Sequence, residues 1–198
     1  FRTAQALTAA GITSERTDFP ETRLPSVALA KEGHSPLATL LIIAEGALDD
    51  DTAETFAELS DFVERGGNVL VLAQDVCPRG LPAPTQLEPR EWVSQPFIRT
   101  PQHPVLSGSL YTATPSSSGQ SSVFNLQSSI SSYDLHFWAP DRVSARGAYA
   151  KPNGGPAIPL VDSGSEDGLE WIQMMEMHRG QGRYLLCQLP LVANYNEE

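Results

Sequence analysis

The hydrophobic positions in the first half of the chain predict two fully buried strands with a helix between them. Leu37–Ala44 (LATLLIIA) and Asn68–Ala73 (NVLVLA) are apolar without alternation, which is typical of strands that are covered on both faces. Asp50–Arg65 carries apolar residues at helical spacing after an acidic start, and Gly66 and Gly67 end it. A strand, a helix and a strand in so short a span predict a right-handed unit with parallel strands.

The chain before this unit has a weaker pattern. Apolar residues recur every third position in Phe1–Ala10, which predicts a helix with one apolar face. We expect a short strand over Ile12–Asp18 and a loop from there to Pro36.

The last third predicts further strands that are joined by short turns. The turn Arg179-Gly-Gln-Gly182 indicates an antiparallel hairpin. Four prolines (Pro78, Pro82, Pro84 and Pro89) exclude a helix directly behind the second buried strand, and Ser107–Ser122 is typical of a loop. The expected strands are Arg142–Ala150, Ala157–Asp162, Glu170–His178 and Arg183–Leu189.

These elements together predict an α/β fold. We expect a mostly parallel sheet flanked by helices, with an antiparallel hairpin added near the C-terminus. The 198 residues suit a single domain, residues 1–198. Because the chain begins at Phe1 rather than methionine, we expect either a processed end or, as we favour, a piece of a larger protein.

Composition excludes several classes of function. The formal net charge of −11 disfavours binding to nucleic acid, and no apolar run is long enough to cross a bilayer, so we expect a soluble chain. Cys77 and Cys187 have no metal-binding spacing, and the four histidines form no metal motif. We therefore expect no metal and no other cofactor.

The order of elements resembles that of the class I glutamine amidotransferase-like fold, which has a flavodoxin-like sheet. The segments that carry the resemblance are LLIIAEGALDD, VERGG, NVLVLAQD and GQGRYLLCQLPL. A second resemblance is to a module found near the C-terminus of multidomain glycoside hydrolase family 2-type proteins. It rests on DLHFWAPDRV, PLVDSGSEDGLEW and GQGRYLLCQLPLV. In those proteins the sugar chemistry belongs to a separate barrel domain, and a secreted parent would place the chain in an extracellular or periplasmic compartment.

Active members of the amidotransferase class carry a cysteine on a G-x-C-x-G elbow and a histidine near the last strand. In this chain Cys77 lies beyond the strand end and Pro78 follows it. Proline has no backbone N–H to stabilise an oxyanion. The loss of one such donor typically lowers the catalytic rate by about 10²–10³-fold. Leu189 or Pro190 occupies the position of the histidine. We therefore expect that Cys77 is not a nucleophile.

The best positions for a retained ligand site follow the two buried strands. Glu45, Gln74 and Asp75 come directly after these strands, and ligands of open α/β sheets bind in the crevice at the carboxyl ends of parallel strands. The alternative is that these polar side chains only satisfy the backbone of loops.

Aromatic residues offer a second possibility, which is stacking on sugar rings. In Tyr133–Trp138 three aromatic residues lie close to an acid, so we include Asp134 and Trp138 among the candidate ligand-binding residues. Trp92 and Trp171 are further candidates for stacking, and core or interface packing is the alternative for all of these aromatic residues.

The leading hypothesis is a non-catalytic, amidotransferase-like accessory module of a carbohydrate-active protein. It would pack against neighbouring domains of the parent protein or against another subunit. The main alternative is a hydrolase or amidotransferase that uses residues not singled out above. A third hypothesis is a carbohydrate-binding module.

Overall fold

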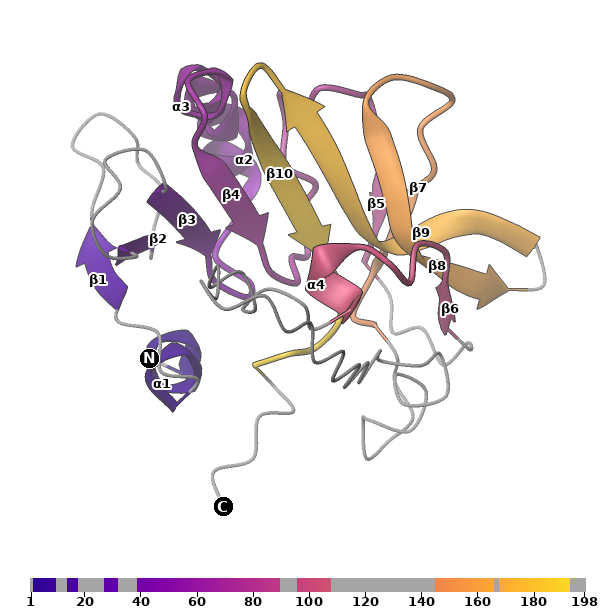
Figure 1. Ribbon diagram of the computed structural model, residues 1–198, viewed down its shortest axis with the longest axis horizontal. Coiled ribbons are helices and arrows are strands. Elements are labelled where there is room, and N and C mark those ends of the chain that lie inside the picture. The colour runs from indigo at the N-terminus through magenta and orange to yellow at the C-terminus, as the bar shows by residue number, and fades with distance from the viewer. Residues whose placement is uncertain are drawn as a thin grey trace, which may run out of the picture.

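The computed structural model of the chain describes residues 2–9, 14–17, 27–31, 39–89, 96–107, 145–165 and 168–192 (Figure 1). The helical segments are α1 (Arg2–Ala9), α2 (Asp50–Thr55), the 3-10 turn η1 (Phe56–Leu59), α3 (Ser60–Glu64) and α4 (Pro104–Ser107). The strands are β1 (Ser14–Thr17), β2 (Val27–Lys31), β3 (Thr39–Ile43), β4 (Asn68–Val71), β5 (Leu87–Glu88), β6 (Pro96–Ile98), β7 (Ala148–Ala150), β8 (Ala157–Ser165), β9 (Gly168–Arg179) and β10 (Gly182–Cys187).

The strands form one mixed sheet. Its main order is β1-β2-β3-β4-β10-β9-β7-β5. Strand β8 pairs with the other edge of β9, and β6 pairs with β8. The pairs β3–β4 and β4–β10 are parallel, whereas the other pairings are antiparallel. In Figure 1 the long strands β8 and β9 curl away from the central strands.

The predicted fold class, a flavodoxin-like and mostly parallel sheet flanked by helices, is therefore wrong. Each parallel pair of neighbouring strands needs a crossover connection, which is usually a helix. Within the described residues, only the segment from β3 to β4 supplies a helical crossover between adjacent strands. The strands of the last third return through short turns instead, so they add to the sheet as antiparallel neighbours.

The predicted strand–helix–strand unit is confirmed. Strands β3, β4 and β10 are neighbours, with Leu41 beside Val69 and Val69 beside Tyr184. The expected helix over Asp50–Arg65 is present as α2, η1 and α3, which are interrupted by one 3-10 turn. Its start is capped, because Asp49 Oδ1 accepts a hydrogen bond from the Thr52 backbone N–H at 2.8 Å.

The prediction of a loop up to Pro36 is wrong in part. Val27–Lys31 forms β2, which pairs antiparallel with β1 on one side and with β3 on the other. This strand is held by pairing to both neighbours, and its short sequence VALAK gives little periodic signal of its own. Helix α1 and strand β1 lie within the segments that the sequence predicted for them.

The strands of the last third lie where they were predicted, with altered ends. The hairpin of β9 and β10 turns at Gly180, which has φ of +58°. The turn of this hairpin lies close to α3. A Cβ added to Gly180 would lie only 2.6 Å from the Glu64 carbonyl oxygen, so a larger residue would not fit there without a shift. Apart from Ser107, which ends α4, the predicted loop Ser107–Ser122 lies outside the described residues.

The two faces of the central strands differ in their cover. On the face that we call the helical face, α2, η1 and α3 pack on a fully buried cluster that includes Leu41, Val71 and Tyr184. On the face that we call the opposite face, Leu106 of α4 packs with Met174 and Cys187 near the carboxyl ends of β4 and β10. Figure 1 shows α2 and α3 behind the central strands and α4 in front of them.

Candidate functional site

The carboxyl ends of β3, β4 and β10 meet at one edge of the sheet, where open α/β sheets bind their ligands. Gln74 lies there and is 1% exposed. Its side-chain Nε2 donates hydrogen bonds to the carbonyl oxygens of Ala44 (2.6 Å) and Leu72 (2.8 Å). Its Oε1 accepts a hydrogen bond from the Leu48 backbone N–H at 2.9 Å. The Gln74 amide is thus fully used in joining the chain after β3 to the chain after β4.

Gln188, directly after β10, completes this network. Its Oε1 accepts a hydrogen bond from the Gln74 backbone N–H at 3.3 Å, and its Nε2 donates to the Tyr149 hydroxyl at 3.0 Å. The Gln188 backbone N–H donates to the Gln173 carbonyl oxygen at 2.8 Å. Gln188 therefore lies where β9 changes its partner from β10 to β7, and it holds the ends of four strands together.

The other two strand-end candidates have different environments. Glu45 is half-buried, and its Oε1 accepts a hydrogen bond from the Val192 backbone N–H at 2.8 Å. Asp75 is exposed. Glu45 therefore joins the chain after β3 to the described C-terminal residues, and of these three candidates only the carboxylate of Asp75 is largely accessible to solvent.

Most residues of the candidate aromatic site lie outside the part of the chain that the structure describes. Asp134 and Trp138 lie outside the described residues, as do Tyr133, Phe137 and Trp92. Trp171 is described, and it packs against Ala145 and Ala148 in a small apolar cluster. The environment of Trp171 is therefore that of a packed side chain, which was the alternative to stacking on a sugar.

An open cavity of about 630 Å³ lies along the loop that follows β4. Its lining comes from the loop between Val76 and Leu87 and includes Cys77, two of the four prolines named above (Pro78 and Pro84) and Gly80. The Cys77 Sγ lies 3.7 Å from the Pro78 carbonyl oxygen and 3.8 Å from the Thr85 carbonyl oxygen. The wall is built largely from backbone and short apolar side chains.

The chemistry of Cys77 is that of a protonated thiol. Burial raises the pKa of Cys77 to about 11, and a backbone hydrogen bond at Leu87 and the charge of Arg79 offset only part of this effect. The described histidines, His103 and His178, both contact Glu176. Burial likewise raises the pKa of Cys187, which is fully buried, to about 12.

The roles of Gln188 and Tyr149 were not predicted from the sequence. Gln188 could have been found by analogy with Gln74, because each is a glutamine that follows a buried strand closely. Tyr149 carries no such signal, since only the fold places its hydroxyl beside Gln188.

Comparison of this chain with protein families, with curated proteins and with solved structures gives no match. In the part of the chain that the structure describes, no group of three or more histidine, cysteine, aspartate or glutamate side chains is arranged to hold a metal ion. None of the described helices has the length and apolar character needed to cross a membrane.

Proposed function

We propose that this chain is a non-catalytic module of a larger carbohydrate-active protein, where it packs against a neighbouring domain or subunit. The link to carbohydrate-active proteins rests on the resemblance of three segments to the module near the C-terminus of glycoside hydrolase family 2-type proteins. The non-catalytic role rests on the chemistry at the strand ends.

The hydrogen bonds of Gln74 and Gln188 carry this proposal. Both side chains lie where an α/β enzyme would present its reactive groups, and both are at most 1% exposed. A side-chain amide has two donor hydrogens and one acceptor oxygen, and the Gln74 amide uses all of these groups on backbone partners. Such a residue stabilises the fold and has little capacity left for a ligand.

Cys77 gives independent support. A thiol with a pKa of about 11 carries little thiolate at neutral pH, and the thiolate is the nucleophile. The residue after it is proline, which lacks the N–H that an oxyanion site would need. Two contacts of the Cys77 sulfur are with carbonyl oxygens, and these acceptors would repel a negative charge.

The proposal is tested by incubating the purified chain with aryl galactosides, glucuronides and mannosides, and separately with glutamine. We expect release of aglycone and of ammonia to equal that of a buffer blank. We also expect the Cys77→Ser variant to give the same result. Release above the blank that is reduced in Cys77→Ser, or in variants of Glu45 or Asp75, would contradict the proposal.

A further inference from the structure

The opposite face of the central strands is less covered at its amino-terminal end than at its carboxyl-terminal end. The register places side chains of this face in rows across the sheet. The row nearest the strand starts contains Leu40, Asn68, Arg183 and His178. The next row contains Ile42, Leu70, Leu185, Glu176 and Ile158, and a third row contains Cys187, Met174 and Val161.

Exposure falls from the first row to the third. The side chains of Arg183 and His178 are 49% and 52% exposed. In the second row Leu70 and Leu185 are partly buried, and Ile158 is exposed. The third row is buried, as expected beneath α4. Ile42 and Glu176 of the second row are buried. The accessible side chains of the first two rows have both apolar and polar parts, and we call them the row surface: Leu40, Asn68, Arg183, His178, Leu70, Leu185 and Ile158.

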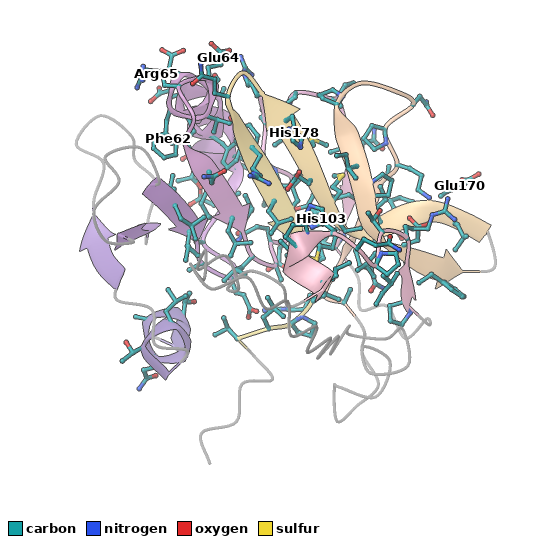
Figure 2. All side chains as sticks on the ribbon, viewed as in Figure 1. Phe62, Glu64, Arg65, His103, Glu170 and His178 are labelled. Carbon is teal, nitrogen blue, oxygen red and sulfur yellow. The ribbon has the colours of Figure 1, made fainter. Side chains whose placement is uncertain are left out.

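Glu176 holds the polar groups of the row surface in place. Its side chain is 4% exposed, and its Oε2 lies 3.2 Å from Arg183 Nη1 and 3.2 Å from His103 Nε2. Its Oε1 contacts His178 Nε2. Figure 2 shows His103 and His178 on the side of the central strands that carries α4. The acceptor of this cluster is thus buried, whereas the guanidinium and one imidazole reach solvent.

Arg183 has donors to spare at this surface. A guanidinium has five N–H donors in a fixed plane. Within the described part of the chain, Arg183 Nε donates to Asn68 Oδ1 at 3.2 Å and Nη1 donates to Glu176 Oε2 at 3.2 Å. These bonds fix the plane of the guanidinium, and its other donors suit the two oxygens of a carboxylate.

We propose that the row surface is a docking site for a carboxylate-bearing segment of a neighbouring protein domain. The carboxylate of an aspartate or glutamate binds Arg183, and an apolar side chain next to it packs on Leu70 and Leu185, which lie side by side on β4 and β10. This inference rests on the proposed packing role, and it names the surface and the chemistry of the partner. A nucleic acid would also offer anions, but it would bring many phosphate charges against a chain with a net charge of −11, whereas the proposed segment brings a single carboxylate to Arg183.

The test uses the isotope-labelled full chain and two capped five-residue peptides. One peptide alternates leucine with glutamate, and the other alternates leucine with glutamine. We expect the glutamate peptide to shift the NMR signals of Arg183 Nε–H and of the Leu70 and Leu185 backbone amides in a saturable way. We expect its dissociation constant to be at least about fivefold lower than that of the glutamine peptide, as for a charge-assisted pair.

Matched variants separate this surface from general charge attraction. Arg183→Gln should remove the preference for the glutamate peptide. Arg179→Gln should keep it, because Arg179 lies in the same hairpin but pairs with Glu64 beside α3. Equal affinity for the two peptides, no saturable shift at these residues, or equal effects of the two variants would overturn the docking surface. Enzymatic turnover by the chain would contradict the non-catalytic role instead, so the two proposals fail separately.

Discussion

The two faces of the central strands are built from the same three strands, yet they differ in what completes them. On the helical face, two side chains of each strand are at most 1% exposed, because α2, η1 and α3 follow β3 directly and fold back on it; these are Leu41 and Ile43, Val69 and Val71, and Tyr184 and Leu186. On the opposite face, Leu40, Leu70 and Leu185 are only partly buried, although Ile42 and Cys187 of the same face are at most 1% exposed. The comparison shows that local connections complete one face, whereas the other face depends on more distant parts of the chain and, as we propose, on a partner.

The largest expected difference between the faces is in stability. Phe56 is fully buried, and its ring lies 5.6 Å from that of Tyr184 on the helical face. We expect Phe56→Ala to lower the free energy of unfolding by about 3–5 kcal/mol. We expect Leu70→Ala to lower it by about 1 kcal/mol, since part of that side chain is already in water. Urea denaturation measures both values, and similar losses in the two variants would contradict the difference in cover.

A smaller effect is expected on how the stability that Glu176 provides to the opposite face depends on pH. Burial raises the pKa of Glu176, but hydrogen bonds from His178 and Arg183 outweigh it, so the pKa lies below its ordinary value. A carboxyl group with a lowered pKa in the folded state stabilises the fold above its ordinary pKa and loses this contribution as pH falls through the folded value. We therefore expect the stability difference between the natural chain and Glu176→Gln to be larger at pH 7 than at pH 3.

Urea unfolding of these two proteins over a series of pH values gives this difference directly. A difference that stays constant across the series would show that the Glu176 carboxylate is not specifically stabilised by its neighbours. A difference that grows as pH falls would reverse the sign that the contacts require.

The smallest expected effect is on the reactivity of the two thiols. Cys187 is fully buried beneath α4, whereas Cys77 is half-buried in the wall of the cavity. We expect iodoacetamide to modify Cys77 slowly at pH 8, with a rate that rises as pH approaches about 11, the pKa of this thiol. We expect Cys187 to react only in unfolded chains. Rapid modification of Cys77 at neutral pH would contradict its buried, protonated state.

The same contrast between local and distant connections explains which parts of the fold could be predicted from the sequence. The buried strands β3, β4 and β10 and the helical segment between β3 and β4 follow from apolar runs, a cap and a glycine stop, which are local signals. The mixed order of the sheet could not be predicted in this way, because it depends on which distant segments pair. Strand β2 was missed for the same reason, since it pairs with two neighbours but has a short sequence of its own.

The candidate site shows the same limit. The position of Gln74 after a buried strand was correctly read from the sequence, and the strand end is where the structure places it. Its role depends on Gln188, which is 114 residues away in sequence and comes beside it only through the pairing of β4 with β10. A periodic pattern cannot reveal whether such a side chain will meet a ligand or another part of the chain.

The central claim is that the strand-end side chains of Gln74 and Gln188 stabilise the fold and do not bind a ligand. Its most direct test is the free energy of unfolding of Gln74→Ala and Gln188→Ala in urea. If these side chains stabilise the fold, each substitution leaves buried backbone or hydroxyl groups without partners and lowers stability by about 1–3 kcal/mol. Polar residues kept for a ligand commonly cost stability, so their replacement would leave it unchanged or raise it. We predict the loss in both variants, and unchanged or increased stability in either one would contradict the account.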